Sequence, residues 1–126
     1  MNYLLDVNIL IDGIVQTHSR HAQARAWLAG KSVVLCPIVE LGFLRICTNK
    51  KSAIGLTMEG ARQALDKFVR ERKADRIADD LEALDSHPRT SGQVTDHYLA
   101  DLAAKHGLNL ATFDGQLKHA SAELVS

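Results

Sequence analysis

Four acidic residues stand where the sequence around them is apolar or where a buried element ends: Asp6, Glu40, Asp96 and Asp114. A buried carboxylate without a partner is costly, so several inward-pointing acids require a cation. Carboxylate oxygens are ligands that Mg²⁺ and Mn²⁺ prefer, and such sites keep several waters on the ion. The four acids therefore predict metal chemistry, provided that the fold brings them together.

Each acid also has an ordinary structural explanation. Asp6 can cap the turn after a strand, Asp114 can belong to a turn, and Asp96 can be a first-turn helix acid. Glu40 fits such an explanation least, because Arg45 is the only other charged side chain in the apolar stretch around it. On a helix, Arg45 would point about 140° away from Glu40. Taken together, the four acids favour a cation site.

Short apolar strands are expected to position two of these acids. Residues 3–5 form an apolar run that stops at Asp6, and residues 108–113 form another that stops at Asp114. A further strand is expected at residues 33–35. In parallel α/β sheets the ligand crevice lies outside the carboxyl ends of the strands. Both carboxylates should therefore face the same edge of the sheet.

Helical periodicity occupies much of the remaining sequence. Helices are expected over residues 19–29, from Pro37 onward, from Thr57 through Val69, and over residues 95–105. Ser19, Thr57 and Thr95 are the expected N-caps, and Asp96 lies at the N-terminal end of a core-facing stripe. The segment from 74 to 89 is less regular, with a short strand at Ile77. Strands that alternate with helices predict an α/β fold with a parallel sheet flanked by helices.

Length and composition fit one globular domain over residues 1–126, in which 15 Lys and Arg balance 15 Asp and Glu. Zero net charge gives no overall attraction to nucleic acid, although residues 61–76 are rich in Arg and Lys. No apolar run reaches the ~18 residues that span a bilayer, and the N-terminal stretch lacks the bases of a signal peptide. We expect a cytoplasmic protein with no membrane partner, in which Cys36 and Cys47 are reduced core thiols.

Other chemistries have weaker support in the sequence. His18 and His21 have the spacing of a zinc-binding pair, but no second pair of Cys or His accompanies them, so we expect surface histidines. No Gly-rich loop has the Walker or Rossmann spacing, and no serine or cysteine stands in a recognisable nucleophile motif. Metal chemistry at the acids remains the favoured interpretation.

Four short motifs stand in order along the chain: LLDVN at residues 4–8, ELGFLR at 40–45, TDHYLADLA at 95–103 and TFD at 112–114. Together they resemble the PIN-domain family, and within it the VapC-type toxins of bacterial toxin-antitoxin pairs. Each motif is short, but four in this order span almost the whole chain and form a specific signature. The resemblance implies a PIN-like domain, a twisted parallel β-sheet flanked by α-helices, with endoribonuclease activity that depends on Mg²⁺ or Mn²⁺.

The resemblance also implies a role for each acid. Asp6 and Asp96 would bind the metal, and Glu40 and Asp114 would complete the catalytic set. Water activated by the metal would hydrolyse an RNA phosphodiester bond and leave a 5′-phosphate and a 3′-hydroxyl. The resemblance therefore implies that the predicted cation site is a hydrolytic centre.

Further positions would support this centre. Asn8 would orient Asp6, and Arg45 would hold the site or contact RNA. Two residues depart from the family pattern: His97 follows the third acid where a small residue is usual, and Asp101 adds an acid that many members lack. Asp101 points off the core-facing stripe and is expected to be solvated, with a supporting role at the metal as the alternative.

A VapC-type toxin implies an RNA substrate, a small antitoxin protein that covers the acidic site, and a homodimer. Two other functions stay open. A haloacid-dehalogenase-like phosphatase also places an Asp after a strand, but that class needs a second Asp two residues later, where this chain has Asn8. A module that binds RNA or an antitoxin without cleaving would keep the fold and lack the chemistry.

Overall fold

The computed structural model describes residues 2–126. Five strands form one sheet in the order β3-β2-β1-β4-β5, and all its neighbouring strands are parallel. The strands are β1 (Asn2–Leu5), β2 (Ser32–Leu35), β3 (Asp75–Arg76), β4 (Asn109–Thr112) and β5 (Ala122–Leu124). Because the strands are parallel, their carboxyl ends meet at one edge of the sheet.

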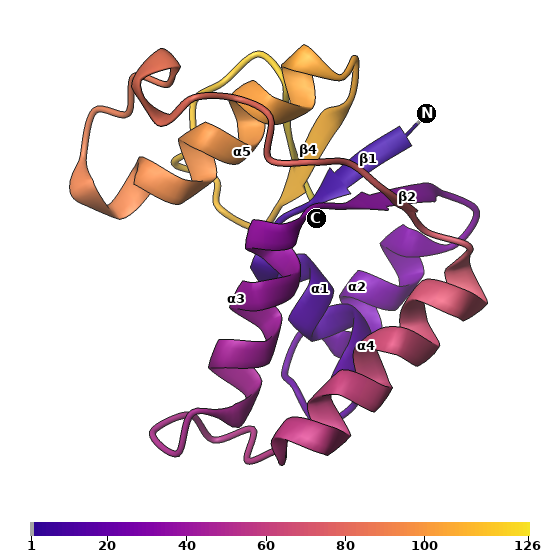
Figure 1. Ribbon diagram of the computed structural model, residues 1–126. Helices are drawn as coiled ribbons and strands as arrows, with labels where there is room; N and C mark the ends of the chain where they lie inside the picture. The colour runs from indigo at the N-terminus through magenta and orange to yellow at the C-terminus, as the bar shows by residue number, and fades with distance from the viewer. Residues whose placement is uncertain (1) are drawn as a thin grey trace.

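Helices cover both faces of the sheet (Figure 1). They are α1 (Val7–Ile14), α2 (His21–Leu28), α3 (Pro37–Thr48), α4 (Met58–Arg72) and α5 (Val94–Lys105), with single 3₁₀ turns η1 (Ala83–Asp85) and η2 (Ser91–Gln93). In Figure 1, α5 lies beside β4 on one face, and the other four helices lie together on the opposite face. The predicted α/β class, a parallel sheet flanked by helices, is confirmed.

The central strands are buried on both faces, as parallel sheets require. In β1 only Asn2 is exposed, and in β2 only Ser32 is exposed. Leu4 pairs with Val34 on one side and with Leu110 on the other, and all three are buried. None of the helices described within residues 2–126 is both long and apolar enough to cross a bilayer.

Several local signals act as expected. Pro37 is the first residue of α3, where its missing N–H leaves no bond unmade. The Thr57 hydroxyl caps α4 by accepting a hydrogen bond of 3.0 Å from the Gly60 amide. Cys36 and Cys47 are buried and free, so they are core thiols as predicted.

Two expected N-caps are wrong. Helix α2 begins at His21 rather than after Ser19, and α5 begins at Val94, one residue before the expected cap Thr95. The 3₁₀ turn η2 leads directly into α5, so 3₁₀ hydrogen bonds take the place of a capping side chain there. The sequence predicted a short strand at Ile77. The structure has a short strand next to that position, β3, which ends at Arg76, one residue earlier.

Candidate active site

The buried carboxylate of Asp6 lies directly after β1, and both of its oxygens are held. Oδ1 accepts a hydrogen bond of 2.7 Å from the Val7 amide, which makes Asp6 the N-cap of α1. Oδ2 accepts a hydrogen bond of 2.8 Å from the Thr112 hydroxyl at the end of β4. Only 3% of Asp6 is exposed. The sequence correctly allowed Asp6 a capping role, and that role fixes the orientation of the carboxylate.

Two further carboxyl groups lie beside Asp6. Asp96, in the first turn of α5, lies close enough to Asp6 for each carboxyl group to affect the pKa of the other. Asp114 follows β4, the strand next to β1, and its charge acts on both Asp6 and Asp96. Adjacent strand ends and the start of one helix therefore bring three of the four predicted acids together.

Burial and neighbouring negative charge oppose the ionisation of Asp96 and of Asp6. Burial, followed by the charges of Asp6 and Asp114, raises the pKa of Asp96 to about 6. Burial also raises the pKa of Asp6, although hydrogen bonds from Thr112 and Val7 act in the opposite direction. A divalent cation relieves this repulsion, and three carboxylates are a donor set that suits a hard ion such as Mg²⁺ or Mn²⁺.

The fourth acid, Glu40, makes a different contact. It lies in the first turn of α3, after β2, and its carboxylate accepts two hydrogen bonds from the Arg76 guanidinium, at 2.8 and 3.2 Å. The side chain of Glu40 is 17% exposed, whereas that of Arg76 is 54% exposed. Glu40 on the apolar helix α3 thus forms an ion pair with Arg76, which belongs to the edge strand β3.

The supporting residues named from the sequence lie on the surface. Asn8 is exposed in the first turn of α1, and Arg45 is exposed on α3. The side chain that holds Asp6 is Thr112, which sequence reasoning did not assign. The Thr112 hydroxyl also accepts a hydrogen bond of 3.0 Å from the Asp114 amide, so one hydroxyl connects two of the acids. The only sequence signal was its place two residues before Asp114.

The expectation that Asp101 is solvated surface is wrong. Its carboxylate lies between His97 and His119, at 3.0 and 2.7 Å, and its side chain is 25% exposed. These contacts hold Asp101 because His97 lies one helical turn before it on α5 and the segment between β4 and β5 brings in His119.

Besides Arg76, which pairs with Glu40, the basic stretch at residues 61–76 is engaged elsewhere on the surface. Within that stretch, Arg70 pairs with Asp66 at 2.6 Å, and the Arg72 guanidinium donates to the Leu28 carbonyl at 2.9 Å. Arg20, by contrast, lies over the ring of Phe113, 4.6 Å from its centre, next to Asp114 in the sequence. Arg20 therefore places a positive charge near the edge that carries the acids.

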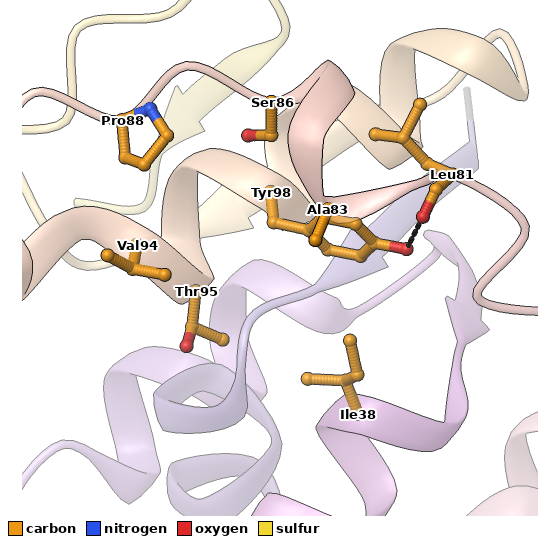
Figure 2. A pocket seen from close by; sticks show the side chains of 8 residues that line it. All are labelled: Ile38, Leu81, Ala83, Ser86, Pro88, Val94, Thr95 and Tyr98. Carbon is orange, nitrogen blue, oxygen red and sulfur yellow. Dashed lines mark hydrogen bonds between the residues drawn. The ribbon is translucent and has the colours of Figure 1, made fainter.

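An apolar hollow of about 460 Å³ opens beside the first turn of α5. Figure 2 shows its walls: Ile38 from α3, Val94, Thr95 and Tyr98 from α5, and Leu81, Ala83, Ser86 and Pro88 from the segment before α5. The Tyr98 hydroxyl donates to the Leu81 carbonyl at 2.5 Å and fixes one wall. The hollow suits an apolar side chain or a base, and it adds no carboxylate to the three aspartates.

Known proteins resemble this chain along nearly its whole length. A family model described as "PIN domain" matches residues 3–123. Ribonuclease VapC38 of Mycobacterium tuberculosis is 38% identical, and the match covers 88% of this chain and 84% of that protein. Ribonuclease VapC39 of the same organism is 34% identical, and the match covers 99% of this chain and 98% of that protein.

A solved structure has the same fold. It is the crystal structure of VapBC2 from Rickettsia felis bound to a DNA fragment from their promoter, with a TM-score of 0.61 and 18% sequence identity. The superposed region covers 92% of this chain and 90% of that chain.

Proposed function

Because this chain belongs to the PIN domain family, we propose that it is a VapC-type endoribonuclease, the toxin of a bacterial type II toxin-antitoxin pair. The resemblance seen in the four sequence motifs is thereby confirmed at the level of the family. The observation that carries the proposed chemistry is the convergence of Asp6, Asp96 and Asp114 at the carboxyl edge of the sheet. Residues 1–126 would act as one catalytic domain.

The aspartates are the proposed metal ligands. Asp6 and Asp96 would hold the ion, and Asp114 would complete the set from the end of the neighbouring strand. When bound, Mg²⁺ or Mn²⁺ lowers the pKa of water and neutralises charge on the scissile phosphate. Thr112 and the Val7 amide keep the Asp6 carboxylate in one orientation, as partners behind a ligand commonly do.

Glu40 is the proposed fourth acid of the catalytic set. It follows β2 at the same sheet edge as Asp6, and its pairing with Arg76 is compatible with that role. More than half of the Arg76 side chain is exposed, so the guanidinium has room to move away from Glu40 when a substrate or an ion is bound.

Three exposed polar residues are proposed to contact RNA. Arg45 and Arg20 supply positive charge for phosphates, which gives affinity with little choice of sequence. Asn8 is the second residue of α1, two residues after Asp6, and its exposed side chain is proposed to make a polar contact with the substrate.

The proposed protein partners are a small antitoxin that covers the carboxylate edge and a second copy of this chain in a homodimer. The likeness to the VapBC2 assembly of Rickettsia felis supports the first partner. The apolar hollow beside α5 would receive an apolar side chain of that antitoxin.

Cleavage of a synthetic single-stranded RNA by the purified chain tests this proposal, with Mg²⁺, with Mn²⁺ and with a chelator. We expect cleavage that leaves 5′-phosphates, stops with the chelator, and is lost in Asp96→Asn. The matched control is Asp66→Asn, which makes the same chemical change in an exposed surface pair. Cleavage by Asp96→Asn at the wild-type rate contradicts the assignment of the site. Retained RNA binding without cleavage under every condition would favour a non-cleaving binding module.

A further inference from the structure

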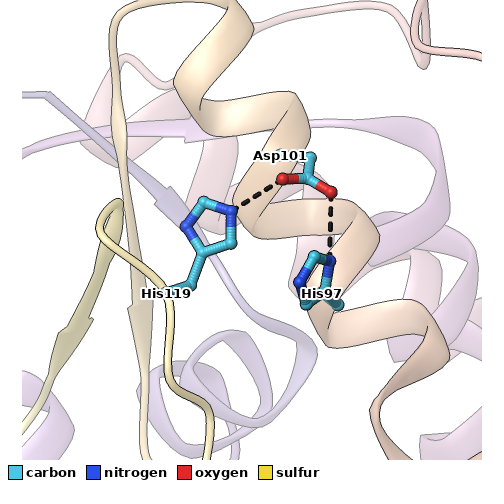
Figure 3. Close-up of side chains that lie close together, drawn as sticks. All are labelled: His97, Asp101 and His119. Atoms are coloured by element: carbon cyan, nitrogen blue, oxygen red, sulfur yellow. Dashed lines mark hydrogen bonds and ion pairs between the residues drawn. The ribbon is translucent and has the colours of Figure 1, made fainter. Parts of the chain in front are cut away.

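A second cluster of ligand-type side chains lies on another face of α5. Figure 3 shows Asp101 between His97, from the same helix, and His119, from the segment between β4 and β5. His97 Nδ1 lies 3.0 Å from Asp101 Oδ2, and His119 Nε2 lies 2.7 Å from Asp101 Oδ1. All three side chains are at most one quarter exposed. The cluster is therefore partly shielded from water and open on one side.

This cluster is separate from the three aspartates. Asp96 and His97 are consecutive in α5, so their side chains leave the helix about 100° apart. His97 and Asp101 are four residues apart and share one helix face. His97 and Asp101 thus face His119, while Asp96 faces Asp6. The two clusters are connected through α5 and through the segment that runs from Asp114 to His119.

The donor atoms have the chemistry and spacing of a transition-metal site. One ligand atom from each side chain lies within 4.8 Å of the other two. Around a tetrahedral zinc ion with bonds of about 2.0–2.1 Å, neighbouring ligand atoms lie about 3.3 Å apart. The two imidazole nitrogens lie 3.0 and 2.7 Å from different oxygens of Asp101. Because the chosen ligand atoms all lie within 4.8 Å of one another, no separation has to close by more than about 1.5 Å to reach the tetrahedral spacing. Two imidazoles favour zinc, cobalt and nickel over magnesium.

We propose that His97, Asp101 and His119 bind one zinc-class divalent cation, at a site distinct from the carboxylate centre. Three protein ligands leave one position for water. A cation there ties α5 to the segment before β5. Because Asp96 and Asp114 lie on these same two elements, the bound cation fixes their relative position.

One hydrogen bond limits the affinity of this site. The Ser121 amide donates to His119 Nδ1 at 3.0 Å, so the proton of the neutral ring lies on Nε2 and faces Asp101. Binding through Nε2 moves that proton to Nδ1 and releases the Ser121 amide, which lowers the affinity by up to about tenfold. Ser86, which is buried, lies 3.2 Å from His97 Nδ1 and helps to hold that ring. We therefore expect weaker binding than at a site of the same ligands in which this hydrogen bond is absent.

Titration of the chelator-treated chain with Zn²⁺ alone, and with Co²⁺ alone, tests the proposal. We expect one equivalent of Co²⁺ to produce visible absorption bands, Zn²⁺ to remove them and raise Tm, and a hundredfold excess of Mg²⁺ to leave them. Asp101→Asn and His119→Gln should each weaken binding by at least about tenfold. Metal-free Tm values of the two variants verify that both are folded.

The chain supplies matched controls. His18→Gln alters a histidine that also pairs with an aspartate, Asp12, and Zn²⁺ binding should be unchanged in that variant. Asp96→Asn, which disables the proposed nuclease centre, should also bind Zn²⁺ normally, so the two proposals fail independently. Equal Zn²⁺ affinity in wild type and His119→Gln overturns the site. So does the absence of saturable binding, or a loss of binding in Asp96→Asn but not in Asp101→Asn.

Discussion

The Thr112 hydroxyl donates a hydrogen bond of 2.8 Å to the carboxylate of Asp6, 106 residues away in the sequence. The same oxygen accepts from the Asp114 amide, so it joins the two strand ends that carry the proposed ligands. The substitution Thr112→Val keeps the volume of the side chain and removes its hydroxyl. We expect affinity for Mn²⁺ and cleavage rate to fall about 10–100-fold, the usual effect of losing a partner behind a ligand.

Thr112→Ser is the matched control for that substitution, because it keeps the hydroxyl and removes only a methyl group. We expect it to retain most of the Mn²⁺ affinity, as measured by calorimetry, together with most of the activity. If both variants lose activity equally, packing at the end of β4 matters and the hydrogen bond to Asp6 does not.

The mutual repulsion of the aspartates predicts that a disabling substitution stabilises the metal-free protein. Asp96→Asn removes one charge from a group whose pKa is raised to about 6 by burial first and then by the charges of Asp6 and Asp114. At neutral pH and without metal, we expect Tm to rise by about 3–8 °C, the effect of about 1 kcal/mol in a small domain. Thermal unfolding with a chelator present measures this. An unchanged or lower Tm in Asp96→Asn would mean that repulsion among the carboxyl groups does not destabilise the folded protein.

The same pKa shift sets the pH dependence of stability. The ordinary pKa of an aspartate is 3.8 and that of Asp96 in the folded chain is about 6, so the folded state binds more protons between these values. Without metal, stability should therefore fall as pH rises from about 4 to about 6, and should stay lower above that range. With saturating Mg²⁺ the gain in Tm should grow over the same range, because the ion needs deprotonated ligands. A flat metal-free profile contradicts this prediction.

The sequence located the acids because each follows an apolar run or interrupts one. Parallel strand ends then implied that Asp6 and Asp114 share an edge, which the order β1-β4 bears out. The partner of Glu40 was not predictable. Arg76 lies 36 residues away, on a two-residue edge strand that is exposed and has no apolar pattern.

The sequence pattern did not predict helix α1, for a different reason. Its sequence, VNILIDGI, is short and mostly apolar, has buried residues in an unbroken run from Ile9 to Gly13, and has no acidic residue in its first turn and no basic residue in its last turn. Asp101 was misjudged because its partner His119 comes from a loop segment, and no periodicity along α5 reveals a neighbour of that kind.

The ion pair between Glu40 and Arg76 allows the role of Glu40 to be tested. If Glu40 belongs to the catalytic set, Glu40→Gln should lower the cleavage rate about 10–100-fold, whereas Arg76→Gln should leave the rate near wild type. Arg62→Gln is the control, since Arg62 lines the same surface hollow as this pair. Similar small losses of activity in Glu40→Gln and Arg76→Gln, with equal losses of stability, would make the ion pair purely structural.

Arg20 gives a prediction about RNA binding that is independent of the metal. Its guanidinium lies over the ring of Phe113, next to Asp114, and it is exposed on the side of the molecule that carries the acids. In an Asp96→Asn background, which leaves RNA uncut, Arg20→Gln should weaken binding of single-stranded RNA. The slope of log affinity against log salt should also become shallower by about 0.7 for each RNA phosphate that the variant no longer neutralises. Arg25→Gln, on α2 in a hollow with Lys67 and Glu71, is the matched control and should leave that slope unchanged. If the two arginine variants change the slope equally, the RNA does not run past Phe113, and its phosphates must be bound elsewhere on the surface.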